Sequence, residues 1–204
     1  MGLEIGSFER INSDGDKELK HGALTIDRMS SNVVAVMNAL ARNETIFKLI
    51  YFEDDKPMNH DIKNPITEED KRARDVFVNG SIRNVNSKEN KISPLPFNPE
   101  AQTEDSVFIR VYYNQGNITH GELVHNTQMH VDIICSKDLW LIEDDVRELG
   151  LIRPYAIFSR VVEEVGNRNA NNEIKVGNFV GFQHLSVNSK FECIRLYSDT
   201  MQLG

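Results

Sequence analysis

Apolar residues after Thr25 recur at steps of three and four, the spacing that places side chains on one face of a helix. The members of this first stripe are Ile26, Met29, Val33, Val36, Met37 and Leu40. Asn43 follows at a position suited to the N-cap of a second, shorter helix, because its side chain can accept a hydrogen bond from the first turn. The apolar residues of that helix are Ile46, Phe47, Leu49 and Ile50. The pattern therefore predicts two successive helices.

A further helix is predicted to begin at Pro154. Proline suits the first turn of a helix, where its missing N–H leaves no bond unmade. The apolar stripe of this helix consists of Ile157, Val161 and Val165. Gly166 is interpreted as its end, since glycine commonly follows the last helical residue.

Alternation with a period of two, which is typical of half-buried antiparallel strands, occurs in two segments. They are residues 107–113 and 129–135, and strand-like runs follow at 176–182 and 191–197. The segment 114–117 contains Asn and Gly and is interpreted as a turn after the first strand. Roughly two long helices and four to six strands predict an α+β fold, in which a mainly antiparallel sheet is packed by about two helices.

Polar segments set the predicted organisation of the chain. Residues 1–24 are interpreted as an extended N-terminal arm, followed by a single α+β domain over residues 25–204. Within that domain, residues 53–105 hold five of the six prolines and many Asn, Asp and Lys residues. A short turn is expected at 67–70 and a strand at 75–85. The rest is predicted to be an inserted region of long projecting loops, because a structureless loop of that length is uncommon in a compact domain unless it has a function.

The composition favours a soluble, cytosolic globular chain. Apolar residues make up 40% of the sequence, and the formal net charge is −8. An acidic surface argues against a sequence-independent grip on nucleic-acid phosphates, which needs clustered Lys and Arg. An acidic surface would instead suit the lining of a conduit, because it repels DNA and DNA then passes without adhering. No apolar stretch approaches the roughly 18 residues of a membrane span, and the N-terminus lacks the apolar core of a signal peptide, so neither is expected.

Cys135 and Cys193 both lie in apolar, strand-like runs and lack CxxC spacing. We expect two reduced, buried thiols that act as small apolar residues. A disulfide or a metal-binding pair is the alternative interpretation.

Three histidines and an aspartate come close together in the sequence. They are His120, His125, His130 and Asp132. Imidazole and carboxylate groups bind transition metals, so a metal-dependent hydrolase is the enzyme hypothesis that this cluster supports. His125 has the opposite strand parity from His120 and His130, however, and neither HExxH nor HxH spacing is present. We therefore favour histidines on the faces of a hairpin, with no metal.

The sequence also lacks the common catalytic patterns. It has no GxGxxG or GxxxxGK[ST] phosphate cradle and no GxSxG elbow. The acidic runs 53–55 and 143–145 are interpreted as solvated caps and loops rather than Mg²⁺ sites, because consecutive acids point in different directions. We thus expect no enzyme, no catalytic residue and no cofactor, and we favour a structural or assembly subunit.

The order of the elements resembles a known family. After the first helix come NETIFKLIYFEDDKP, SVFIRVYY, QMHVDIICSKDLWLI, RPYAIFSRVVEEV and a closing pair of strands. The chain resembles proteins encoded in the head–tail region of long-tailed bacteriophage genomes, and more narrowly the tail terminator (tail-completion) or neck family. The resemblance covers about residues 25–200. Its most specific piece is the strand HVDIICSKDLWLI, followed closely by the helix start at Arg153-Pro154.

The resemblance implies a small domain with two helices on a mainly antiparallel sheet, whose copies assemble into a ring, commonly of about six. The ring is expected to cap the tail tube and join it to the head, at the tail–head junction of a virion assembled in the host cytoplasm. Its expected partners are further copies of itself, the tail tube protein and head-completion or neck proteins. DNA is expected to pass through the lumen without specific binding, and no membrane is involved.

Candidate contact residues follow from this role. The projecting region is expected to contact an adjacent copy or the tube through Asn84, Asn86, Lys88, Asn90 and Lys91. The acidic residues expected to line the lumen are Glu143, Asp144 and Asp145. The region 53–105 and the N-terminal arm exceed the minimal family domain, which leaves the exact role open. A head–tail adaptor or stopper of the neck and a non-viral protein-docking module are the alternatives.

Overall fold

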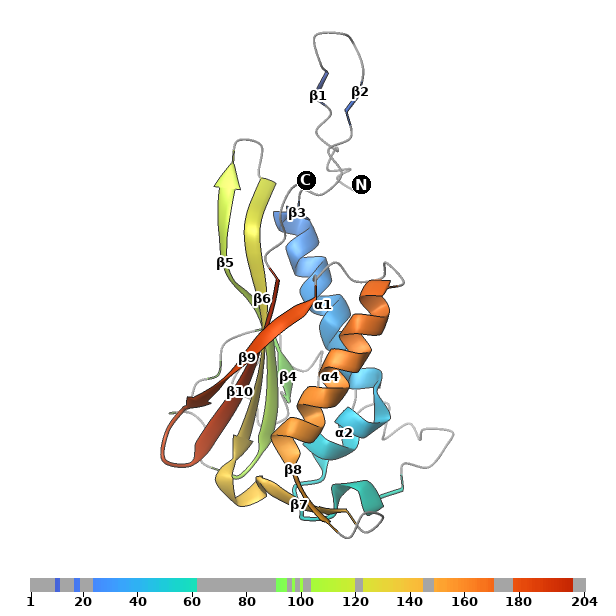
Figure 1. Ribbon diagram of the computed structural model, residues 1–204, viewed down its shortest axis with the longest axis vertical. Helices are drawn as coiled ribbons and strands as arrows, with labels where there is room; N and C mark the ends of the chain where they lie inside the picture. Colours follow the sequence, from blue (N-terminus) through green and yellow to red (C-terminus); the bar gives the residue numbers. More distant parts are fainter. Residues whose placement is uncertain are drawn as a thin grey trace, which may run out of the picture.

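The computed structural model describes residues 10–11, 17–18, 24–61, 91–94, 97, 100, 104–119, 123–144, 149–170 and 178–199. Within these residues, one six-stranded sheet carries the helices on a single face (Figure 1). The predicted α+β class is therefore confirmed. In the N-terminal arm, β1 (Arg10–Ile11) pairs antiparallel with β2 (Lys17–Glu18). The turn expected at 67–70 and the strand expected at 75–85 lie outside the described residues.

Both N-terminal helices form as predicted. α1 comprises Ile26–Arg42, and α2 comprises Glu44–Tyr51. The side chain of Asn43 caps α2 by accepting a hydrogen bond from the backbone N–H of Ile46, with an N···O distance of 3.1 Å. From Val33 onward, the predicted apolar residues of both helices are buried. The periodicity thus identified the core-facing side of each helix.

α4 (Arg153–Ala170) starts where the sequence predicts but continues past Gly166. The prediction that Gly166 ends the helix is wrong. A glycine ends a helix where the chain turns into a left-handed conformation, and Gly166 keeps ordinary helical backbone. The residue is exposed, and a β-carbon there would touch nothing. Gly166 is therefore a helix residue of low propensity rather than a stop signal.

The strands lie in the order β4–β5–β6–β10–β9, and β3 pairs with the far end of β6. Their bounds are Leu24–Thr25 (β3), Ile92–Ser93 (β4), Val107–Thr119 (β5), Leu123–Ser136 (β6), Phe179–Ser186 (β9) and Phe191–Ser198 (β10). All neighbours are antiparallel except β4 and β5, which are parallel. The strands predicted at 107–113, 129–135 and 191–197 are confirmed. The strand predicted at 176–182 is found a little later, as β9.

β5 and β6 form a longer hairpin than the sequence pattern predicts. The turn expected at 114–117 is wrong, because β5 continues to Thr119. The ladder shifts register between Tyr113 and Gln115, and again between Gln115 and Asn117. The glycine and asparagines of this segment therefore mark irregularities in a continuous strand, where an extra residue is accommodated without reversing the chain.

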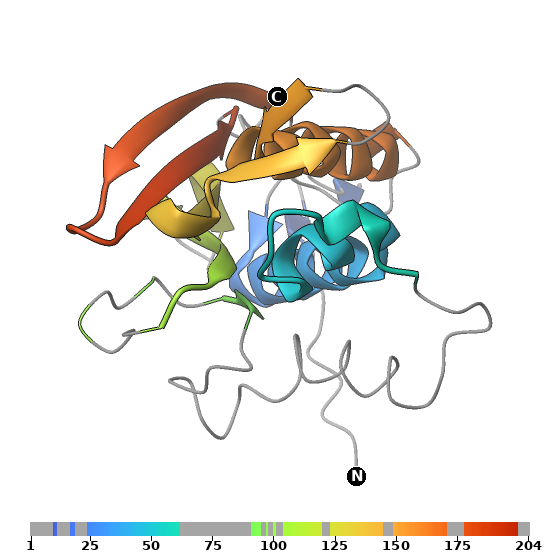
Figure 2. The same ribbon diagram turned by 90° about the horizontal axis from the view of Figure 1, so that it is seen from below.

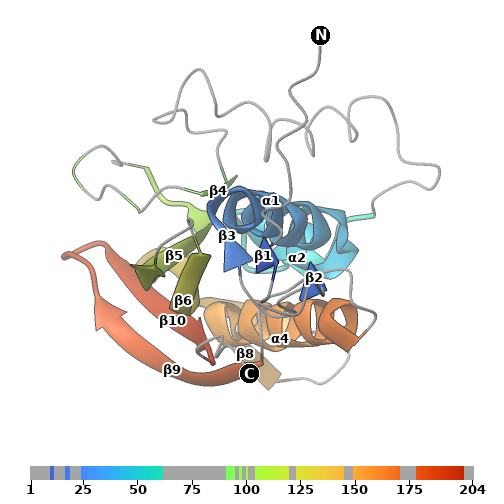
Figure 3. The same ribbon diagram turned by 90° about the horizontal axis from the view of Figure 1, so that it is seen from above.

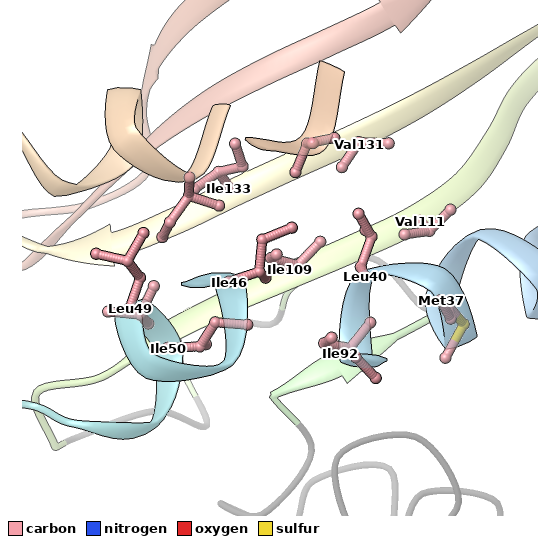
Figure 4. Close-up of a cluster of buried hydrophobic side chains, with 14 of the residues drawn as sticks. Met37, Leu40, Ile46, Leu49, Ile50, Ile92, Ile109, Val111, Val131 and Ile133 are labelled. Carbon is pink, nitrogen blue, oxygen red and sulfur yellow. The ribbon is translucent and has the colours of Figure 1, made fainter. Parts of the chain in front are cut away.

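The main core lies between the helices and the sheet (Figure 4). A row of directly paired residues, Val111, Val131 and Leu196, runs across β5, β6 and β10. Ile92 of β4 is also fully buried there, so part of the region predicted to project contributes to the sheet and the core. A smaller buried cluster on the opposite face of the sheet contains Phe108, Ile134, Phe191 and Cys193.

The helices cover different parts of the sheet. α1 packs on β4 and β5, α4 packs on β6 and β10, and α2 contacts both helices. Views from below and above show the sheet curving around the helices, so that β9 lies at the α4 end and β4 at the α1 end (Figure 2 and Figure 3). A two-stranded antiparallel ribbon of β7 (Leu141–Asp144) and β8 (Leu149–Ile152) precedes α4.

Candidate interaction surface

A polar cluster occupies the sheet face opposite the helices. Arg195 donates two hydrogen bonds to Asp132, from Nε to Oδ1 at 2.7 Å and from Nη2 to Oδ2 at 2.8 Å. The Tyr112 hydroxyl donates to the same Oδ2 at 2.8 Å and accepts from Nη2 of Arg195 at 2.9 Å. Burial and the hydrogen bond to Asp132 raise the pKa of Tyr112 above its ordinary value of 10.0. Both oxygens of Asp132 are thus engaged within the chain.

His130 lies beside this cluster and is buried. Its Nε2 is 3.1 Å from Oε1 of Gln128, whereas Nδ1 has no hydrogen-bond partner in the part of the chain that the structure describes. Burial, together with the positive charge of Arg195, lowers the pKa of His130 below its ordinary value of 6.5. The site therefore favours the neutral imidazole.

The histidine cluster noted in the sequence is only partly described by the structure. The side chains of His120 and His125 lie outside the described residues. His130 and Asp132 share one face of β6, as alternate residues of a strand do, but Asp132 is bound to Arg195. Among the described residues, no group of three His, Cys, Asp or Glu side chains is arranged to hold a metal ion.

Cys135 and Cys193 are free, buried thiols, as predicted. Cys135 belongs to the core beneath the helices, whereas Cys193 belongs to the cluster on the opposite face of the sheet. Burial raises the pKa of each thiol to about 12. The reactive thiolate is therefore scarce near neutral pH.

Arg153, the first residue of α4, is fully buried and binds four backbone carbonyls. Nε donates to the carbonyl of Leu139 at 2.9 Å, and Nη2 donates to that of Asp54. Nη1 donates to the carbonyls of Leu49 at 2.9 Å and Phe52 at 2.8 Å. The last carbonyls of α2 lack helical partners and lie at the negative end of its dipole, which favours a cation there. Arg153 thus holds the start of α4 against the end of α2.

Exposed apolar side chains gather where α4 meets β9. We call this surface the α4–β9 face; its members are Ile152, Tyr155, Val162, Val180 and Phe182, each between 38% and 58% exposed. Phe182 packs against two rings of α4, with centroid distances of 6.5 Å to Tyr155 and 5.3 Å to Phe158. Single exposed apolar residues are normal on a protein surface. Here the ring contacts of Phe182 join β9 to α4, and exposed apolar residues that adjoin one another are typical of an interaction site.

A groove of about 350 Å³ borders the α4–β9 face, between α2, the β7–β8 ribbon and α4. Ile152 and Tyr155 belong to both the groove and the face, and Met58 and Leu151 line the groove further along. On the ribbon, Leu141 pairs directly with Ile152 and is 67% exposed. The exposed apolar surface therefore continues from β9 across the start of α4 to the ribbon.

A family model matches residues 43–200, well over half of the chain, and the match spans α2, β4 to β6, α4, β9 and β10. The chain belongs to the YomW family. This family is phage-associated, so the chain is a phage-related protein. No curated protein and no solved structure matches it. In the part of the YomW-family chain that the structure describes, no helix is long and apolar enough to cross a bilayer.

The first acidic run of this YomW-family chain is engaged in local contacts. Glu53 forms an ion pair with Lys91 and accepts a hydrogen bond from the Ser106 hydroxyl. Oδ2 of Asp54 lies within hydrogen-bond distance of Nε2 of His60, at 2.5 Å. The Lys91 side chain is 12% exposed, so most of it is committed to contacts within the chain. Its predicted contact with another copy or the tube stays a prediction.

The other predicted contact residues are only partly covered. Glu143 is exposed and forms an ion pair with Lys56 at 3.0 Å. Asp144 belongs to β7, with its side chain outside the described residues. The remaining predicted residues lie outside the described part of the chain: Asn84, Asn86, Lys88, Asn90 and Asp145.

Sequence reasoning did not find the α4–β9 face. Tyr155 and Phe182 were not singled out, because an exposed aromatic side chain and a buried one have the same pattern along the chain. One signal was present: Tyr155 and Val162 lie seven residues apart on α4, off the stripe of Ile157, Val161 and Val165. A second apolar stripe on an amphipathic helix is a sign of a second contact.

Proposed function

We propose that this YomW-family chain is a structural virion protein of a tailed bacteriophage, a tail terminator whose copies form a ring that caps the tail tube and joins it to the head. The α4–β9 face is the observation that carries this proposal, because it offers an apolar contact to a neighbouring protein. The phage-associated family supplies the setting. A small sheet with helices on one face is also the architecture expected of a terminator.

The size of the face limits how strong one contact can be. Full burial of a large apolar side chain is worth about 1.5–3 kcal/mol, so covering the exposed half of each contributes roughly 1 kcal/mol. Five side chains then supply roughly 5 kcal/mol, against an association cost of about 4–15 kcal/mol. Two copies alone should bind weakly. A closed ring, or one formed on the tube, is stronger because its last subunit binds through two contacts at once.

The proposed role gives the chain two further partners, the tail tube protein on one side and head-completion or neck proteins on the other. The formal net charge of −8 suits a lumen through which DNA passes without adhering.

The proposal is tested by light scattering over a range of protein concentrations, followed by negative-stain imaging with and without assembled tail tubes. Rings with a central hole, or caps on tube ends, are the expected result. A chain that stays monomeric at every concentration and leaves the tubes bare would overturn the proposal. Rings that bind heads but not tubes would reassign the chain to the neck.

A matched pair of variants links assembly to the face. Phe182→Lys places a charge within the α4–β9 face, whereas Ser189→Lys places the same charge on the exposed turn of the same hairpin. We expect the first variant to lose ring or cap formation and the second to keep it. Equal loss in both variants would show that added charge, rather than the apolar contact, is responsible.

A further inference from the structure

The described sheet has an open edge at each end. β9 pairs with β10 on one side and with no described strand on the other. At the opposite end, β4 covers β5 only at Ile109 and Arg110. The rest of that edge, from Val111 to Thr119, faces away from β6 and has no partner among the described strands.

Neither open edge carries a charged side chain or a proline, although register shifts interrupt the open part of β5. Edge strands are normally blunted by lysine or other charged side chains, or by proline. β9 reads FVGFQHLS and the open part of β5 reads VYYNQGNIT, so neither contains Lys, Arg, Asp, Glu or Pro. In a chain with a net charge of −8, two uncharged edges are surfaces where a second copy approaches without like-charge repulsion.

Strand direction makes the two edges complementary. β5, β6, β10 and β9 alternate in direction because each adjacent pair is antiparallel. β9 therefore runs opposite to β5. Within one copy β9 lies level with residues 107–112 of β5, where β4 covers part of the edge. A second copy in the same orientation is therefore displaced along the strands until its open β5 segment meets β9. The two strands are then antiparallel neighbours, which is the better-bonded arrangement.

We infer that β9 of one copy pairs antiparallel with the open part of β5 of the next copy, and that this head-to-tail contact continues the sheet from subunit to subunit. This inference rests on the proposed ring and specifies the two strands that join neighbouring subunits in it. The α4–β9 face then packs against the α1 side of the neighbour. Because the two contacting surfaces differ, the contact is of the kind that closes into a ring rather than a dimer.

Cross-linking between single cysteines tests this pairing. Gln183 on β9 is in register with Arg195, and Arg195 with Asp132 and Arg110, so Gln183 lies on the same sheet face as Arg110 and Tyr112 of β5. Asn114 follows Tyr112 along β5 and lies at the register shift between Tyr113 and Gln115. Gln183 and Asn114 are both exposed. We would make Gln183→Cys, Asn114→Cys and the double variant, and treat each with a short bis-maleimide. The native thiols are buried, and labelling with a monofunctional maleimide checks that only the new thiols react.

The double variant is expected to give a ladder of multimers, and a mixture of the two single variants is expected to give dimers. Each single variant alone should give none. Dimers from Gln183→Cys alone would establish a two-fold β9 contact and overturn the inference. Rings that form without any cross-link would overturn it too, while leaving the proposed function intact. If no rings, no tube caps and no cross-links form at any concentration, both the inferred strand pairing and the proposed function are refuted.

Discussion

Tyr197 lies across Gly181, the residue directly opposite it on the neighbouring strand, and its hydroxyl occupies the place that a β-carbon on residue 181 would need. The glycine is required here for space and not for an unusual backbone conformation. Gly181 also lies one residue from Phe182 and Val180, so the ring of Tyr197 supports the strand that carries the exposed apolar face.

Gly181→Ala is therefore expected to destabilise the fold by about 1–3 kcal/mol, because the new methyl group must displace Tyr197 or push β9 away from β10. Gly166→Ala is the matched control: a β-carbon there meets nothing, so the helix should gain about 0.5–1 kcal/mol. Urea denaturation midpoints measure both effects. In a Tyr197→Ala background the cost of Gly181→Ala should nearly vanish, and a full cost in that background would contradict the steric explanation.

Removing Arg153 should be among the most damaging single changes in the described part of the chain. Arg153→Met leaves four carbonyls, two of them in fully buried hydrogen bonds, without their donor, and we expect a loss of about 3 kcal/mol in the free energy of unfolding. Arg153→Lys should recover less than half of that loss, because a single ammonium group cannot reach all four carbonyls that the planar guanidinium binds. Arg160→Met, which removes only the exposed pair with Glu163, should change stability by less than about 0.5 kcal/mol.

Alkaline pH should destabilise the fold through its thiols. Burial raises the pKa of Cys135 and of Cys193 to about 12 from an ordinary 9.0, so above pH 9 the unfolded chain releases protons that the folded chain retains. Stability then falls as pH rises, and the slope approaches about 1.4 kcal/mol per pH unit for each thiol once the pH is well above 9. Cys193→Ala should make this slope shallower between about pH 9 and 10, as measured by denaturant titrations. An unchanged slope would assign the alkaline loss to other groups.

Mildly acidic pH should also weaken the fold, through His130. Its pKa is lowered from 6.5 by burial and by Arg195, so as pH falls below 6.5 the unfolded chain takes up a proton before the folded chain does. Stability therefore falls with decreasing pH before most carboxylates begin to titrate. His130→Gln should flatten this part of the stability curve between about pH 6.5 and 5. A variant curve parallel to that of the natural chain would refute the role of His130.

Local patterns in the sequence predicted the elements better than their contacts. Periodicity and capping predicted α2, which follows Asn43, and α4, which begins at Arg153-Pro154. They also predicted the strands of the central sheet, because both signals depend on residues that are near neighbours in the sequence. The length of β5 was missed because asparagine and glycine also occur in bulges within a strand. Nothing in the local pattern distinguishes these two uses.

The tertiary role of polar residues could not be predicted in the same way. Arg153 was recognised only as part of a helix start, because its four carbonyl partners come from two separate segments. Ile92, inside a region expected to project, proved to be buried. A deletion of residues 84–100 would consequently remove core packing along with any exposed loop, so it cannot serve as a clean test of assembly.

The strand order has a consequence for the direction of joining. A ring built from β9-to-β5 contacts has no two-fold axis between subunits, so all copies point the same way along its axis. β10 stops pairing with β6 at His130, which leaves the distal half of the β5–β6 hairpin extending beyond it (Figure 1). In every copy this hairpin, paired along β5 with β9 of the neighbour, lies on the same side of the ring, so the upper and lower surfaces of the ring differ. A connector between two unlike structures needs that asymmetry, and here a single subunit already contains it.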